Sequence, residues 1–179
     1  LAGGNVITLE VADSQRFLSN IAYTCQHLHP TPKLLIINYP HNPTGACVDR
    51  AYLAAQAEVA AAHGILLASD ECYQDLWFGS AAPPSSILEV ATTGVLAFHS
   101  CSKRSGMTGY RSGFIAGDAA LIKAYRGWRA HFGVGSPAFI EQAAALAWRE
   151  DTHVEARRAI FAAKYDLLLY PFLLDGVAA

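Results

Sequence analysis

Three continuous apolar runs constrain the fold of this chain more than any other feature. They are KLLIINYP (33–40), ILLASD (65–70) and VLAFHS (95–100). Such runs are typical of strands that are buried on both faces of a parallel sheet. Between the first two lies RAYLAAQAEVAAAH, which Asp49 can cap at its start and Gly64 can close. The pattern therefore predicts strands that alternate with helices.

The rest of the chain adds elements of both kinds. We expect strands at 5–11 and 112–118, and helices at 14–26, 119–131, 137–150 and 152–174. Ser136 and Pro137 would form the cap and the first helical position of the third of these helices. Together the elements predict an α/β fold, with a mainly parallel sheet and helices on both faces.

Composition excludes several classes of function. The chain has 179 residues, 53% of them hydrophobic and 16% charged, which argues against disorder. With 13 basic and 15 acidic side chains the net charge is −2, so we expect no binding to nucleic acid or to an acidic membrane surface. No apolar run reaches the length of about 18 residues that a membrane span needs. The first residues lack the basic segment of a signal peptide, and the four cysteines form no C-x-x-C pair. We therefore expect a cytoplasmic protein with reduced thiols and no metal site.

Polar residues follow three of the predicted strands directly. Asn42 comes after the first, Asp70 ends the second, and Lys103 follows the third. In open α/β sheets ligands bind beyond the carboxyl ends of the strands. The sequence thus places its candidate functional residues at the edge where a ligand is expected.

The segment HSCSKRSGMTGYRSG (99–113) surrounds Lys103 with anion-binding groups. A lysine with a lowered pKa forms a Schiff base with a carbonyl compound. The hydroxyls of Ser100 and Ser102 and the guanidinium of Arg111 could hold a phosphate, and the glycines let the backbone approach it closely. A solvated lysine in a polar loop is the alternative interpretation.

Asp70, Tyr73 and Asn42 also have two interpretations each. Asp70 either caps the turn that follows it or faces a pyridine nitrogen, keeping that ring protonated. Tyr73 is either a half-buried aromatic or a hydrogen-bond donor to a ring oxygen. Asn42 lies in the turn NPTG, where the amide either shapes the turn or donates to a phenolate.

Four separated motifs together resemble one family. The chain resembles the pyridoxal-phosphate-dependent aminotransferases of fold type I in four motifs, which are NPTG, SDECY, SCSK and an arginine. Asp70 of SDECY follows Asn42 of NPTG by twenty-eight residues, and Arg111 follows Lys103 of SCSK by eight. The resemblance implies that Lys103 forms the Schiff base with pyridoxal 5'-phosphate and that Asp70 contacts the pyridine nitrogen. Tyr73 and Asn42 would then bind the phenolic oxygen. The resemblance also makes Ser100, Ser102 and Arg111 the phosphate ligands, with Lys103, Asp70 and Tyr73 as the catalytic residues.

The resemblance also implies an activity and an organisation. The protein would transfer an amino group between an amino acid and a 2-oxo acid, with Lys103 moving a proton at the substrate's α-carbon. The stretch SKRSGMTGYRSGFIAGD is similar to the succinyl-diaminopimelate aminotransferase branch, which uses glutamate as donor. Residues 1–150 would be part of the large cofactor-binding domain of a cytoplasmic homodimer. Residues 151–179 would form a long helix leading to a small C-terminal domain.

The chain resembles an internal piece of such an enzyme. The family's phosphate turn and stacking aromatic would precede Leu1, and its carboxylate-binding arginine would follow Ala179. Two alternatives retain the same residues: a carbon–sulfur lyase or synthase of this fold, and a ligand-sensing domain in a transcription regulator. An inactive isolated domain is a further possibility.

Overall fold

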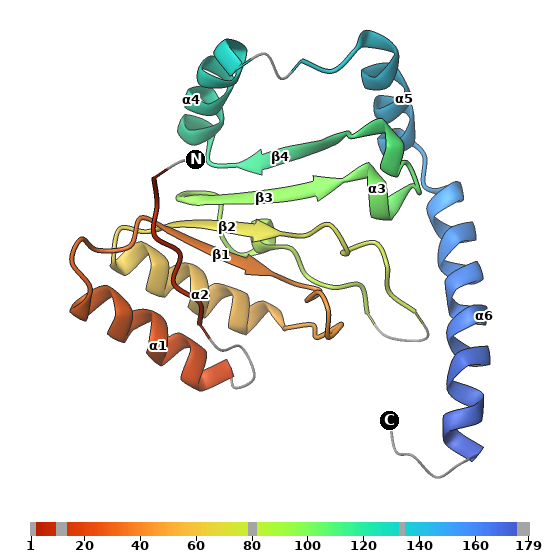
Figure 1. Cartoon of the computed structure of the whole chain (residues 1–179), viewed down its shortest axis with the longest axis horizontal. Helices are drawn as coiled ribbons and strands as arrows, with labels where there is room; N and C mark the ends of the chain where they lie inside the picture. Colours follow the sequence, from red (N-terminus) through yellow and green to blue (C-terminus); the bar gives the residue numbers. More distant parts are fainter. Residues whose placement is uncertain (1–2, 10–13, 79–81, 133–134, 175–179) are drawn as a thin grey trace.

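A four-stranded sheet forms the centre of the protein, with strand order β1-β2-β3-β4 (Figure 1). The computed structural model describes residues 3–9, 14–78, 82–132 and 135–174. The strands are β1 (Leu34–Asn38), β2 (Leu66–Asp70), β3 (Val95–Ser100) and β4 (Gly113–Gly117). The helices are α1 (Ser14–His27), α2 (Arg50–Ala62), α3 (Cys101–Arg104), α4 (Ala119–Arg129), α5 (Ala138–Arg149) and α6 (Thr152–Leu174). Short 3-10 turns cover Ile87–Glu89, Thr108–Tyr110 and Ala130–Phe132.

The first three strands are parallel and end at the same edge of the sheet. In the register Asn38 lies opposite Asp70, and Asp70 lies opposite Phe98. β4 is antiparallel to β3 and pairs Gly113 with Ser100. A Cβ at Gly113 would collide with the carbonyl oxygen of His99, so only glycine allows this pairing. The sequence-based prediction of a mainly parallel sheet is therefore confirmed.

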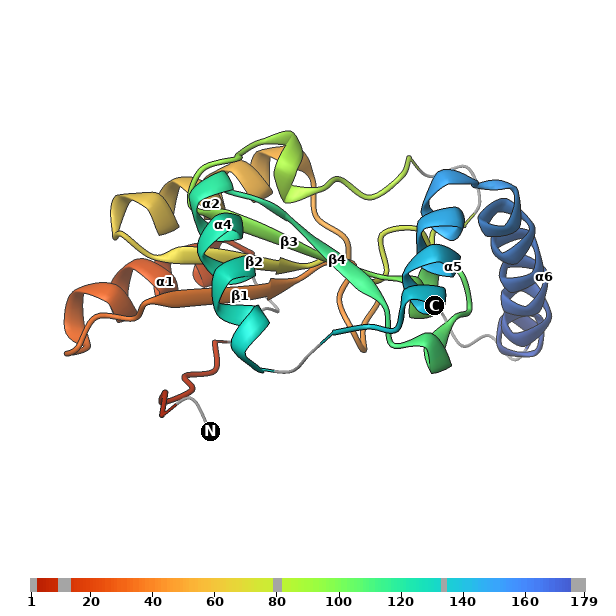
Figure 2. The same ribbon diagram turned by 90° about the horizontal axis from the view of Figure 1, so that it is seen from above.

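One face of the sheet carries the main hydrophobic core. Helices α1 and α2 lie on this side, and α4 lies on the other (Figure 2). Leu53 of α2, Leu67 of β2 and Ile87 are at most 1% exposed, and all belong to one cluster of buried side chains. Asp49 caps α2 by accepting a hydrogen bond from Tyr52 N (2.8 Å), as the sequence predicts.

The opposite face of the sheet is much less covered near β1. Leu34 and Ile36 are 52% and 67% exposed, although they alternate with the buried Ile37. Asp70 lies on this same face, because it pairs in register with Asn38, which is two residues after Ile36. The site edge and the open apolar surface therefore belong to one side of the sheet.

Helices α5 and α6 stand beyond the carboxyl ends of the strands (Figure 1). α6 runs past the sheet rather than over it, and Ile160, Leu167 and Leu168 on it are more than half exposed. Among the described residues, no helix combines the length and the hydropathy that crossing a membrane would require.

Two local predictions from the sequence are wrong. Residues 5–9 form no strand, and Val6 is 90% exposed; positions 10 and 11 lie outside the described residues. The alternation there has no neighbouring strand to pair with, and pairing is what stabilises a strand. Ser136 does not cap α5: the cap position is Pro137, which offers no side-chain hydrogen bond. The other helices and strands agree with the predictions to within about two residues.

Candidate active site

The ends of β1 and β2 are tied together by the side chain of Asn38. Its Nδ2 donates to the carbonyl of Asp70 (2.9 Å), and its Oδ1 accepts from the backbone N–H of Asn42 (2.8 Å). This bridge fixes the turn that carries Asn42 relative to the strand that carries Asp70. The sequence analysis missed Asn38, since an amide at a strand end gives no signal of which backbone groups it will meet.

Asn42 and Tyr73 come together across this edge. Nδ2 of Asn42 donates to the hydroxyl oxygen of Tyr73 (3.2 Å), over a separation of 31 residues. Because that oxygen accepts from Asn42, the hydroxyl proton of Tyr73 points elsewhere and is available to a ligand. The two residues predicted to bind the same oxygen of a cofactor are thus neighbours.

Lys103 approaches the same tyrosine from β3. Its Nζ lies 5.6 Å from the centroid of the Tyr73 ring, which is within the range of a cation–π contact. Lys103 sits on α3, a helix of one turn that starts directly after β3. Since the side chain is exposed, the amine is accessible to a small molecule.

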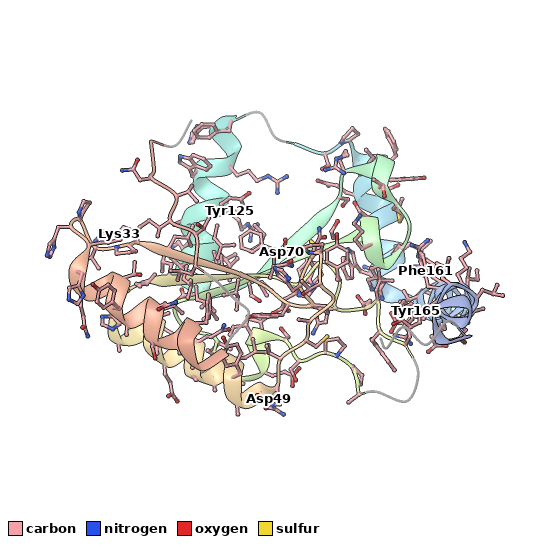
Figure 3. The ribbon with its side chains drawn as sticks, turned by 60° about the horizontal axis from the view of Figure 1, so that its bottom comes forward. Lys33, Asp49, Asp70, Tyr125, Phe161 and Tyr165 are labelled. Carbon is pink, nitrogen blue, oxygen red and sulfur yellow. The ribbon has the colours of Figure 1, made fainter. Side chains whose placement is uncertain are left out.

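Asp70 lies between these groups and affects the neighbouring thiol. Its Oδ1 accepts a hydrogen bond from Cys72 N (3.1 Å). One carboxylate oxygen of Asp70 therefore caps the turn, as one of the two interpretations of this residue predicts. The pKa of the Cys72 thiol is raised to about 12. Burial is the largest cause, and the hydrogen bond to Asp70 and the negative charge of Asp70 act in the same direction, whereas the positive charge of Lys103 lowers this pKa. Asp70 and Lys103 therefore both act on one thiol. Figure 3 shows Asp70 at the centre of the molecule, far from Lys33 at the other end of the sheet.

The three predicted phosphate ligands lie at the end of β3 and in the segment after it. Ser100 caps α3, its Oγ accepting from Ser102 N (3.1 Å). Arg111 is exposed, has a left-handed backbone (φ 51°), and donates from Nη1 to the carbonyl of Thr108 (3.1 Å). Among the described residues, no hydrogen bond or ion pair joins Arg111 or the side chain of Ser102 to Lys103 or Asp70. These three residues share a segment with Lys103 but do not contact its amine.

A buried contact between Glu71 and His99, which the sequence did not indicate, lies beside the site. Glu71 is 2% exposed; Oε1 accepts from Ile87 N (2.8 Å), and Oε2 is 3.3 Å from Nε2 of His99. Burial alone raises the pKa of Glu71, but the contacts with His99 and Ile87 N–H outweigh burial and hold the pKa below its ordinary value. His99 stacks on Phe114, with ring centroids 4.7 Å apart. The second acid in SDECY was the signal that could have revealed this pair.

The arrangement suits chemistry on a small carbonyl compound. An accessible amine, a phenol, an amide and a carboxylate converge at one sheet edge, with two hydroxyls and a guanidinium in the adjoining segment. Within the described residues, no three His, Cys, Asp or Glu side chains are placed to hold a metal ion. The exposed Lys103 amine is a nucleophile that this cluster offers to a ligand.

Comparison with known proteins gives one consistent result. The family described as aminotransferase class I and II matches residues 1–170. A probable aminotransferase of Mycobacterium tuberculosis is 38% identical over 144 residues, which are 78% of this chain and 34% of that protein. An LL-diaminopimelate aminotransferase of Dehalococcoides mccartyi is 34% identical, with 79% of this chain and 37% of that protein covered.

A solved structure gives the same answer for the fold. The N-succinyldiaminopimelate aminotransferase of Mycobacterium tuberculosis superposes with a TM-score of 0.74 at 29% identity, covering 90% of this chain and 41% of that one. The chain thus spans less than half the length of the proteins it matches. Since the family match extends over almost the whole chain, the chain belongs to the aminotransferase class I and II family.

Proposed function

We propose that the protein carrying this chain transfers an amino group between an amino acid and a 2-oxo acid, with pyridoxal 5'-phosphate as its cofactor. The observation that carries this proposal is the cluster at the carboxyl edge of the sheet. There the Lys103 amine lies over the Tyr73 ring, and the Tyr73 hydroxyl accepts from Asn42. Membership of the aminotransferase class I and II family supports the same reaction.

The side chains present fit the groups of this cofactor. Lys103 would hold the aldehyde carbon, and Asp70 would hold the proton on the pyridine nitrogen. Tyr73 and Asn42 would donate to the phenolic oxygen. Ser100, Ser102 and Arg111 would hold the phosphate, since each still has a donor to offer it. When bound, the cofactor supplies an electron sink for the negative charge that develops at the substrate's α-carbon.

Each residue of the chain then has a definite task. The Lys103 amine, once free, acts as the base that takes a proton from the substrate's α-carbon and returns it elsewhere. The Tyr73 ring keeps this amine on the side of the sheet edge where the other donors lie. Asn42 orients the Tyr73 hydroxyl, and Asp70 would hold the positive charge on the pyridine nitrogen. The reaction needs all four at once, which their common sheet edge allows.

We propose a substrate of the diaminopimelate class, with N-succinyl-diaminopimelate and glutamate or 2-oxoglutarate as the pair. Support comes from the resemblance of the Lys103 segment to the succinyl-diaminopimelate branch and from two of the similar proteins, which are named for diaminopimelate or its N-succinyl derivative. We further infer that the protein works in the cytoplasm as a homodimer. Residues 1–150 would belong to its large domain, and the helix that includes α6 would lead to a small one.

Borohydride reduction of the protein with bound cofactor tests the role of Lys103. Reduction should fix the cofactor to one lysine, and peptide mass spectrometry should find it on Lys103. Lys33, Lys123 and Lys164 are the internal controls, because the same digest reports on all of them. An adduct on any of these three instead of Lys103 would refute the assignment.

A product assay separates the proposed reaction from a lyase on the same site. Without an acceptor 2-oxo acid, a transaminase forms at most one 2-oxo acid per bound cofactor, because the amino group stays on the cofactor; repeated turnover needs the acceptor. A carbon–sulfur lyase forms its oxo acid without an acceptor. A ligand-sensing domain of a regulator would bind the cofactor and turn over neither substrate, so this assay distinguishes all three.

A further inference from the structure

Arg104 is a buried cation directly after Lys103 in the chain. Its side chain is 5% exposed. Nε lies 3.3 Å from Oδ2 of Asp75, Nη2 pairs with Oδ1 of Asp151, and Nη1 donates to the carbonyl of Ala147. The guanidinium is thus bound from three directions and has little capacity left for a ligand. Its contacts instead join segments that are far apart in the sequence.

Further contacts support the same fastening. The Arg104 guanidinium lies 4.7 Å over the ring of Trp148 on α5. Ser105, the next residue, has its Oγ 2.9 Å from Nε2 of His153 on α6. Arg157, one turn further along α6, donates from Nη2 to the carbonyl of Lys103 (3.3 Å). Three consecutive residues, 103 to 105, are therefore attached to α5 and α6.

These contacts determine the orientation of α3, because such a short helix is not stable by itself. It has four residues, and a helix of one turn has no independent stability. Successive side chains on a helix are rotated by about 100°, so the direction of residue 104 determines the direction of residue 103. Holding Arg104 on one side of α3 therefore sets where Lys103 points.

Asp75 connects Arg104 to the partner of Lys103. The turn that follows β2 carries Tyr73 and, two residues later, Asp75. The Arg104–Asp75 ion pair (3.3 Å) therefore joins the helix of Lys103 to the turn of Tyr73. We propose that Arg104 is a positioning residue that holds the Lys103 amine over the Tyr73 ring. Its importance for catalysis rests on the function proposed above, whereas the contact between Lys103 and Tyr73 can be measured by itself.

The first test measures that contact in the cofactor-free, full-length protein. Lysines are methylated with ¹³C-formaldehyde, and the Lys103 signal is identified by its loss in Lys103→Arg. The Tyr73 ring current should shift this signal upfield in the wild-type protein. In Arg104→Met the stem remains but the ion pairs are lost, so the signal should move to the position of a solvated lysine. Arg50→Met is the matched control, since Arg50, the first residue of α2, is a surface arginine that pairs with Glu89.

The second test measures turnover of the same variants with bound cofactor. A reacting group that is displaced by about 1 Å can lower a reaction rate by about a hundredfold. We expect Arg104→Met to lower kcat by about tenfold or more. The KM for the amino donor should stay within about twofold, because Arg104 does not contact substrate. Asp75→Asn should show the same split, and the double variant should be no worse than the worse single variant.

The outcomes are decisive in both directions. The proposal would be overturned if, in Arg104→Met, the Lys103 signal kept its wild-type position and kcat kept its wild-type value. If Arg104→Met does not fold, Asp75→Asn alone decides, since Asp75 is partly exposed and its loss leaves Arg104 paired with Asp151. Absence of a Lys103 adduct in the wild-type protein would instead refute the proposed function. The methylation signal would still decide whether Arg104 positions Lys103.

Discussion

Two regions of the site are built on the same scheme and differ in one respect. At the end of β2 the half-buried Asp70 is followed by the buried Glu71. At the end of α3 the exposed Lys103 is followed by the buried Arg104. In each case a second side chain of the same class, acidic or basic, is turned inward and meets partners from other segments. Glu71 faces one histidine, whereas Arg104 faces two carboxylates. In both regions, therefore, a candidate site residue is followed in the chain by a buried side chain that is held by contacts with other segments.

The two regions reach this arrangement through different backbone geometry. Next to a strand, successive side chains point to opposite faces, so Glu71 lies on the core face while Asp70 lies on the open face. On α3 successive side chains diverge by about 100°, and Arg104 needs contacts from three segments to stay in place. The strand position is therefore the more rigid of the two.

The largest expected effect separates the two acids at the end of β2. Asp70→Ala should lower kcat by about a thousandfold, because the fixed charge is lost where the reaction develops charge. Stability should fall by only about 1 kcal/mol, the value of a lost cap to Cys72 N. Steady-state kinetics and thermal melts of the full-length protein measure both. If activity and stability fell in proportion, Asp70 would be a turn cap and nothing more.

The next effect concerns the buried acid. Glu71→Ala should lower the free energy of unfolding by about 3 kcal/mol, because it removes the buried carboxylate that Nε2 of His99 contacts. The N–H of Ile87 also loses its acceptor. Glu58→Ala on the exposed side of α2 is the control and should change stability by less than about 0.5 kcal/mol. Urea unfolding of both variants checks this, and equal losses would contradict the role given to Glu71.

A smaller effect is expected from the polar tip of Tyr73. Tyr73→Phe removes the oxygen that accepts from Asn42 but keeps the ring under the Lys103 amine. We expect kcat to fall by about tenfold, the value of one hydrogen bond made to a developing charge. Tyr73→Ala removes the ring as well and should cost more. If the two variants had the same kcat, the ring contact would have no part in placing Lys103.

The sequence predicted where the candidate site residues lie in the sheet, but it did not predict the contacts that Arg104 makes with distant segments. Asn42, Asp70 and Lys103 could be placed together because each follows an apolar run, and parallel strands end at one edge. Arg104 gave no such signal: its partner Asp151 is 47 residues away, and only the packing of α5 and α6 brings them together. The strand expected at 5–11 failed for a related reason, since alternation does not supply a pairing partner.

The smallest expected effect is a pH dependence of stability that comes from Glu71. The folded protein holds the pKa of Glu71 below its ordinary value of 4.5. A lowered pKa contributes stability that is fully present above the unfolded pKa and is lost as the pH falls through the folded value. Glu71→Gln keeps the shape and removes this titration. The stability difference between the wild-type protein and Glu71→Gln should therefore be constant from pH 7 to pH 5 and should shrink below pH 4.5. Urea unfolding from pH 7 to pH 3 measures this stability difference, with Glu58→Gln as the control. A difference that stays constant down to pH 3 would show that the His99 contact does not stabilise the charged form of Glu71.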